Sequence, residues 1–174
     1  VQIRPLRPFF DAWLDALQAL APPGTDNPRL ALLTPGAKQE TWLEHLYLSR
    51  ELGLELVESG DLTVRDGEVF LKTLRGLRRI DVILRRIKGE SCDPLEFNPG
   101  AGVPGLMAAL REGRVRMANA PGSMLVEAPG MAPYLSACAQ HLLNAPLALP
   151  MLETLWLGDA DARDRQALGH RIGS

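Results

Sequence analysis

The sequence predicts a three-layer α/β domain with a mostly parallel sheet and one β-hairpin, and three observations predict it. Short apolar runs alternate with segments of helical periodicity, which is the pattern of β-α-β units. One run, residues 79–86, is apolar, rich in β-branched residues and bounded by charge, as expected of a buried central strand. An Asp-Gly pair joins two alternating runs and marks a hairpin. The predicted arrangement is Rossmann-like, and a ferredoxin-like α+β arrangement is disfavoured because only one hairpin is visible.

The composition favours a soluble globular protein. The 174 residues are 46% hydrophobic and 23% charged, with a net charge of −2. These values argue against a disordered chain, a membrane span and a general nucleic-acid binder, and the length favours a single α/β domain over residues 1–174. Cys92 and Cys138 lie far apart without metal-ligand spacing, which fits a reducing cytoplasm. Residues 1–5 lack an initiator Met and a signal-peptide pattern, so we expect an excised piece of a longer cytoplasmic chain.

The first third of the chain predicts one β-α-β unit behind an opening helix. Apolar residues recur at helical spacing over residues 9–20, and a Pro-Pro-Gly segment ends that run. An apolar strand at 29–33 is followed by a helix at about 39–52, which Gly53 ends. Residues 54–57 supply the next strand, completing the unit.

The rest of the chain predicts a hairpin, the central strand and two further helices. Residues 61–65 and 68–73 alternate in polarity around Asp66-Gly67, which is the strongest hairpin signal in the chain. The other expected elements are the central strand at 79–86, a Gly- and Pro-rich loop at 89–102, a helix at 103–113, a strand at 115–118, a helix at about 132–143 and one or two tail helices within 152–170.

Two adjacent arginines, Arg85 and Arg86, end the predicted central strand. Successive side chains of a strand point to opposite faces of the sheet, so one of the two can face a cleft. Ligands of open α/β sheets bind beyond the carboxyl ends of the strands, where a guanidinium is a suitable anchor for phosphate or carboxylate. The alternative is that both arginines are ion-paired or solvated. The same edge would collect the turns at 34–36, 58–60 and 119–123.

Other candidate sites have structural alternatives. The chain contains neither a Gly-x-Gly-x-x-Gly motif nor a P-loop, so neither standard nucleotide site is supported. The turn at 34–36 can be a simple strand-to-helix connection, and the three histidines are most simply structural or solvated. Asp93 and Glu96 can bind a cation or a substrate amine, or can be loop residues with Asp93 capping a turn.

Eight short segments, in this order, resemble circularly permuted ATP-grasp proteins of type 2. The resemblance covers about residues 9–156, and each segment alone is weakly specific. The segments are LLTPG at 32–36, EHLYL at 44–48, DLTVR at 61–65, LKTL at 71–74, DVILRR at 81–86, CDPLE at 92–96, GVPGL at 102–106 and NA at 119–120.

The resemblance implies a pre-ATP-grasp-like domain of a larger carboxylate-amine ligase, related at a distance to glutathionylspermidine synthase. No cofactor is expected in this fragment, whereas ATP and Mg²⁺ are implied for the full-length protein. The implied partners are the remaining ATP-grasp domain and a small carboxylate or peptide substrate, with neither nucleic acid nor membrane. The implied substrate-binding residues are Arg85 and Arg86, with Thr34, Gly36, Asn119 and Ser123 as neighbours.

The fragment would be an accessory, substrate-side domain that is not catalytic in isolation. The alternative is a non-catalytic binding or scaffold module that recognises a peptide or a partner protein. Ile87 and Lys88 follow Arg86 where members of the family tend to be acidic, which leaves the substrate open.

Overall fold

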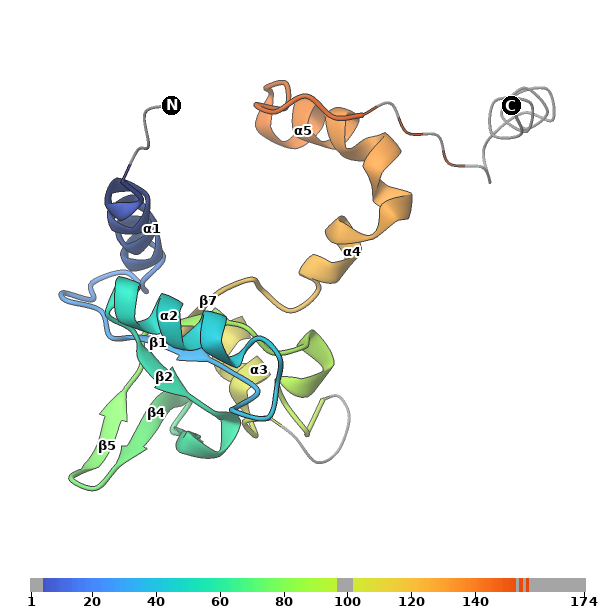
Figure 1. Ribbon diagram of the computed structural model, residues 1–174. Coiled ribbons are helices and arrows are strands. Elements are labelled where there is room, and N and C mark those ends of the chain that lie inside the picture. Colours follow the sequence, from blue (N-terminus) through green and yellow to red (C-terminus); the bar gives the residue numbers. More distant parts are fainter. Residues whose placement is uncertain (1–4, 97–101, 153, 155, 157–174) are drawn as a thin grey trace. The chain divides into compact units, whose positions relative to one another are not determined.

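The computed structural model describes residues 5–96, 102–152, 154 and 156 (Figure 1). The chain divides into two compact units, Val1–Pro121 and Gly122–Ser174, and each is described separately below. The first unit contains both sheets and the two hydrophobic cores, and the second contains short helices.

The main sheet has four parallel strands in the order β2-β1-β6-β7. The strands are β1 (Leu30–Leu33), β2 (Glu55–Val57), β6 (Val82–Arg85) and β7 (Arg116–Ala118). In the register of the sheet, Leu33 of β1 is paired with Val57 on one side and with Arg85 on the other. The prediction of a buried central strand is confirmed, because β6 is an inner strand and all four of its residues are buried.

Alternate residues of the inner strands enter two different cores, which makes the first unit three-layered. Leu30 and Leu32 pack with α1 (Arg7–Ala19) and α2 (Trp42–Leu52) on one face of the sheet. Ala31 and Leu33 lie in the core of the opposite face, with α3 (Leu106–Arg111) and residues of the second sheet. Successive side chains of β1 point to opposite faces of the sheet, so the position of a residue along the strand determines which of the two cores it enters.

The second sheet is antiparallel and consists of β3 (Leu62–Arg65), β4 (Glu68–Thr73) and β5 (Gly76–Arg79). Asp66 (φ 52°) and Gly67 (φ 78°) both have positive φ, as a type I′ turn requires, so the predicted hairpin is confirmed. Strand β5 was not predicted. Its residues are Gly, Leu and two arginines with little apolar alternation, and Arg79 was assigned instead to the central strand.

Three predicted helices begin later than expected. The helices expected from 39, 103 and 132 start at Trp42, Leu106 and Leu135. Gly105 precedes α3 with φ 83°, and Pro133 belongs to a 3₁₀ turn, η3 (Pro129–Tyr134), ahead of α5 (Leu135–Leu143). The residues just before these helices form turns, although the helical pattern of the sequence continues through them.

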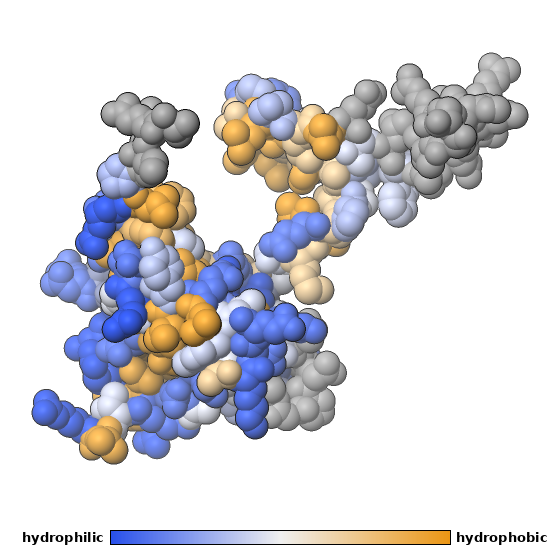
Figure 2. All heavy atoms as spheres, in the orientation of Figure 1, coloured by the Kyte–Doolittle hydropathy of each residue, from blue (hydrophilic) through white to orange (hydrophobic). Residues whose placement is uncertain are grey.

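The second unit exposes most of its large apolar side chains. It contains α4 (Ser123–Glu127), η3 and α5, and Ala139 is its one buried residue among those that the structure describes. Figure 2 shows apolar side chains gathered on the helices of this unit. The exposed ones include Met124, Leu125, Val126, Leu142 and Leu143. The predicted tail helices lie outside the described residues, apart from 152, 154 and 156.

Within the described ranges, no helix combines the length and apolar character needed to cross a membrane.

Candidate functional site

The strand order reverses between β1 and β6, the two inner strands of the main sheet. The chain leaves β1 through α2 to β2 on one side, and leaves β6 through α3 to β7 on the other. In open α/β sheets this switch point leaves a crevice at the carboxyl ends of the strands. A cleft of about 660 Å³ lies here, lined by turns that follow β1, β2 and β6. Its polar lining includes Thr34, Gln39, Glu58, Ser59, Arg86 and Lys88.

The turn after β1 is fixed from within the protein by a buried histidine. Thr34 Oγ1 lies 2.9 Å from His45 Nδ1 of α2 in a hydrogen bond, and both residues are buried. Thr34 Oγ1 also accepts a hydrogen bond from the Gly36 N–H at 3.3 Å. Burial lowers the pKa of His45, because a low-dielectric surrounding disfavours the imidazolium. A neutral imidazole therefore supports the cleft wall at Thr34.

Gly36 brings the turn after β1 against the turn after β2. Gly36 has φ 99°, and a Cβ at this position would lie 2.7 Å from Glu58 Oε1. Only glycine tolerates this backbone conformation and this close approach together. Glu58 is the N-cap of η1 (Ser59–Asp61), and its N–H donates to Asp61 Oδ2 at 2.8 Å. The Glu58 carboxylate thus lies on Gly36 at the wall of the cleft.

The two predicted arginines have different surroundings. Arg85 is buried, and its guanidinium donates to the carbonyl oxygens of Asn119 (2.5 Å), Ala120 (3.3 Å) and Ile87. The Asn119 side-chain amide donates back to the Arg85 carbonyl at 3.1 Å. Arg85 therefore links β6 to the segment that follows β7, and it is not part of the cleft lining.

Arg86 lines the cleft and forms an ion pair with Glu44 of α2. Lys88, two residues further on, also lines the cleft and forms no ion pair with any residue that the structure describes. The expectation that one arginine of the pair faces a cleft agrees with this geometry. Contact between either arginine and a substrate stays a prediction.

The remaining predicted site residues are distributed over both units. Thr34 lines the cleft, Gly36 contacts Glu58, and Asn119 is bonded to Arg85 rather than to the cleft. Ser123 begins α4 in the second unit. Sequence reasoning placed Glu58 in a turn at this edge of the sheet without assigning it a role, and it did not place Lys88 in the site. The signal for both was their place one to three residues after a strand of the parallel sheet.

Asp93 and Glu96 are held by interactions within the protein. Asp93 is buried, and its two carboxylate oxygens accept hydrogen bonds from the N–H groups of Leu95 (2.9 Å) and Met107 (3.0 Å). Glu96 is ion-paired with Arg111, whose hydrogen bonds lower the pKa of the Glu96 carboxyl. The turn-capping alternative for Asp93 therefore agrees with the structure. In the described part of the chain, no three His, Cys, Asp or Glu residues are grouped to hold a metal ion.

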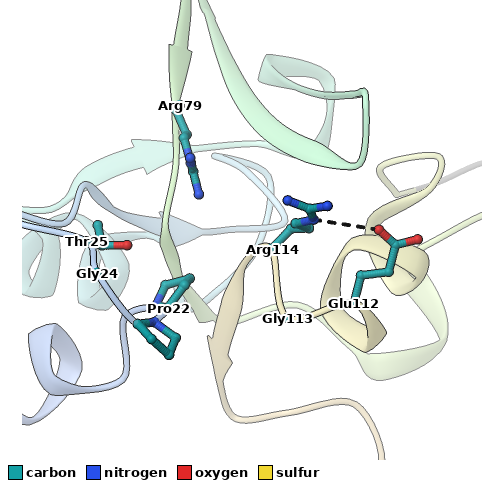
Figure 3. Close-up of a pocket in the computed structure, with 8 residues that line it drawn as sticks. Pro22, Gly24, Thr25, Arg79, Glu112, Gly113 and Arg114 are labelled. Carbon is teal, nitrogen blue, oxygen red and sulfur yellow. Dashed lines mark ion pairs between the residues drawn. The ribbon is translucent and has the colours of Figure 1, made fainter.

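A second pocket, of about 650 Å³, lies at the amino ends of the strands (Figure 3). Figure 3 shows Arg79 and Arg114 at this pocket, with Arg114 facing Glu112. Arg79 pairs with Glu68 (2.9 Å) and with Asp81 (3.0 Å), and Arg114 Nε lies 3.9 Å from Glu112 Oε2. In this pocket Arg79 is already paired with two carboxylates, and ligands of such sheets bind at the opposite edge. We therefore place the candidate site in the cleft at the carboxyl edge.

The fold and the cleft define a doubly wound, Rossmann-like α/β domain with a polar cleft at its switch point. The chain belongs to the circularly permuted ATP-grasp type 2 family, whose model matches residues 1–170. It is 38% identical over 146 residues to an uncharacterized protein of Synechocystis sp., covering 83% of this chain and 30% of that protein. It is 38% identical over 162 residues to one of Mycobacterium tuberculosis, covering 92% of this chain and 18% of that protein.

A third relative, an uncharacterized protein of Mycobacterium leprae, is 34% identical over 175 residues, covering 98% of this chain and 30% of that protein. The chain thus spans less than a third of the length of these relatives.

ATP and Mg²⁺, which the family name implies, do not fit the described residues as a site. Among the described residues that line the cleft, Glu58 is the one carboxylate, and Mg²⁺ bound with a triphosphate is held in proteins by grouped oxygen ligands. Its positive charges are Arg86, which Glu44 already pairs, and Lys88. A triphosphate would find little net positive charge here, so no chemical step through ATP is assigned to this cleft.

Proposed function

We propose that this chain is the substrate-side domain of an ATP-dependent carboxylate-amine ligase, with the cleft as the site for the carboxylate substrate. The observation that carries the proposal is the place of Arg86 and Lys88. Both line the cleft at the switch point of the sheet in a member of an ATP-grasp family. Activation of the carboxylate by ATP would belong to the remaining ATP-grasp domain of a longer protein.

The cleft has the donors that carboxylate binding needs. Arg86 presents five N–H donors and uses some of them on Glu44, while the Lys88 ammonium has no ion partner among the described residues. Charge-assisted hydrogen bonds to a carboxylate are about twice as strong as neutral ones. Thr34 and Ser59 add hydroxyl groups to the same lining. These residues would bind and orient a carboxylate, and none of them is assigned a proton-transfer role.

The proposed partner is the remaining ATP-grasp domain, and the second unit is its proposed contact. Leu125, Leu142 and Leu143 expose between 69% and 76% of their surface. An isolated nine-residue helix such as α5 is marginal in water without an apolar face to pack against. The relatives are more than three times as long as the region they share with this chain, which supplies the chain length for such a partner.

Carboxylate binding is tested by ligand-observed NMR with N-acetylglycine and the 174-residue chain. Lys88→Met and Arg86→Met are each expected to weaken binding by about fivefold or more, since about 1 kcal/mol of charge-assisted bonding is lost. Arg75→Met is the control, because Arg75 lies in the β4–β5 turn outside the cleft lining. Unchanged affinity in both cleft variants would remove the proposal.

Contact with the ATP-grasp domain is tested with Leu142→Glu and Leu143→Glu. In the longer protein, the substitutions are expected to increase susceptibility to limited proteolysis and to lower ATP-dependent phosphate release. In the 174-residue chain alone they are expected to leave the unfolding transition unchanged. If partner capture from solution is lost while phosphate release is kept, the second unit belongs instead to a binding or scaffold module.

A further inference from the structure

Charges of opposite sign line the cleft on the two sides of β1. Glu58 follows β2, and Lys88 follows β6, while β1 lies between these strands in the sheet. Neighbouring strands are about 4.8 Å apart, so β2 and β6 are separated by roughly 10 Å across β1. Neither residue forms an ion pair with any residue that the structure describes, and they do not pair with each other. The cleft therefore presents a separated carboxylate and ammonium.

The Glu58 carboxylate is positioned rather than loosely attached. It accepts a hydrogen bond from the Asp61 N–H in the capping box of η1, and it lies against Gly36. Its own backbone is fixed by the hydrogen bond from Glu58 N–H to Asp61 Oδ2. One acceptor position of the carboxylate is taken by the Asp61 N–H, and the remaining lone pairs are available to a cationic group of a ligand.

The charge balance of the cleft disfavours a polyanion and favours a zwitterion. Among the described lining residues, Arg86 and Lys88 are positive and Glu58 is negative, and Glu44 of α2 compensates Arg86. A ligand with a single carboxylate makes no use of Glu58, which is exposed and solvated at the cleft. A ligand that carries an ammonium as well matches both sides.

We infer that the cleft binds an amino acid or a short peptide in zwitterionic form, with Glu58 accepting hydrogen bonds from its ammonium and Lys88 donating to its carboxylate. This inference rests on the proposed carboxylate site and adds the class of the substrate. Arg86 lies beside Lys88 and supports the carboxylate from the α2 side. Glu58 then selects against substrates that lack a free amine.

The test compares three probes on the unmodified 174-residue chain by ligand-observed NMR. The probes are glycylglycine, N-acetylglycylglycine, which lacks the ammonium, and glycylglycinamide, which lacks the carboxylate. Glycylglycine is expected to bind about fivefold or more tightly than either analogue, because each analogue loses one charge-assisted contact. Glu58→Gln is expected to abolish the preference for glycylglycine over its N-acetyl form and to leave the affinity for the N-acetyl form unchanged.

Glu55→Gln is the matched control, because Glu55 is an exposed glutamate of β2 that pairs with Arg78 and lies outside the cleft lining. Equal binding of glycylglycine and its N-acetyl form to the unmodified chain overturns the amine site, while the carboxylate site stands. A loss of both affinities in Glu58→Gln assigns Glu58 a structural role and also overturns the inference. If glycylglycinamide binds as tightly as glycylglycine and N-acetylglycylglycine, the cleft does not recognise a carboxylate and the proposed function itself fails.

Discussion

Arg85 and Arg86 are adjacent in the sequence, yet the first is buried and the second lines the cleft. Arg85 has the same parity as Ile83, which lies in the core on one face of the sheet, and its guanidinium binds backbone carbonyls. Arg86 lies beyond the last residue of β6 and lines the cleft. The sequence predicts that the two side chains diverge. It does not predict which one is buried, because two of the Arg85 acceptors, the carbonyl oxygens of Asn119 and Ala120, lie more than thirty positions away in the sequence.

Arg85→Met is expected to lower the free energy of unfolding by about 2–4 kcal/mol, because it removes a buried guanidinium and leaves the buried Ile87 carbonyl and the partly buried Asn119 carbonyl without a charged donor. The measurement is urea denaturation of the 174-residue chain. Arg78→Met is the control, because it removes an exposed pair with Glu55, which is worth at most about 1 kcal/mol. Equal stability of the two variants would show that Arg85 does not hold the connection after β7.

His45 is expected to give the protein a pH-dependent stability. Its pKa in the folded state lies below the ordinary 6.5 because the ring is buried. As the pH falls below about 6.5, the unfolded chain therefore takes up a proton at His45 before the folded chain does. The free energy of unfolding is highest above this pH and decreases as the solution is acidified towards the lowered pKa of the folded state. The maximum slope from one group is about 1.4 kcal/mol per pH unit.

Urea denaturation of the parent chain and of His45→Gln, each at about pH 7.5 and about pH 5.5, checks this assignment. The variant is expected to lose less stability between the two pH values, even though it starts lower because the Thr34 contact is changed. His141→Gln, at an exposed position of α5, is the composition-matched comparison. Identical pH dependence in His45→Gln and the parent chain would contradict the role of His45.

At the scale of elements, the sequence predicts most strands and helices, but not strand β5 and not the first residue of every helix. The four apolar runs of the parallel sheet and the Asp66-Gly67 hairpin follow from local patterns of residues. Strand β5 does not, because it is held by pairing with β4 and not by an apolar pattern of its own. The late start of α3 depends on Gly105, whose positive φ ends a turn inside an apparently helical segment.

The segment before α3 depends on a close backbone contact at Gly102. A Cβ at Gly102 would lie 2.7 Å from the carbonyl carbon of Cys92, and φ there is 129°. Gly102→Ala is therefore expected to lower the free energy of unfolding by about 2–3 kcal/mol. Gly60→Ala, where nothing lies within 4 Å, is expected to stay within about 0.5 kcal/mol of the parent. Urea denaturation of both variants checks the difference, and equal stabilities would contradict the contact.

At the scale of the whole molecule, both hydrophobic cores lie within the first unit. Every buried residue of the two clusters falls between Phe10 and Val115. A chain ended after Pro121 is therefore expected to unfold in one cooperative transition, within about 1 kcal/mol of the full 174 residues. Circular dichroism during urea denaturation measures this. Loss of the cooperative transition would show that the second unit completes the core of the first.

The candidate site could be predicted only in part, because its charge balance depends on contacts between residues that are distant in the sequence. The turns that follow parallel strands can be named from the sequence, and the cleft is lined by three of them. Their charge balance depends on tertiary pairing. Glu44 compensates Arg86 from α2, and the Gly36 turn positions Glu58, and neither relation is visible in the spacing of residues.

The most direct test of the central claim is a map of amide chemical shifts in the ¹⁵N-labelled 174-residue chain during titration with glycylglycine. A zwitterion site in the cleft predicts shifts that converge on Ser59 and Lys88 of the lining and on Gly36 beside Glu58, on both sides of the β1/β6 switch point. Gly24 and Gly113, at the amino-edge pocket, are expected to stay unchanged. Chemical-shift changes at Gly24 and Gly113, with no change in the turns at the carboxyl edge, would contradict binding in the cleft.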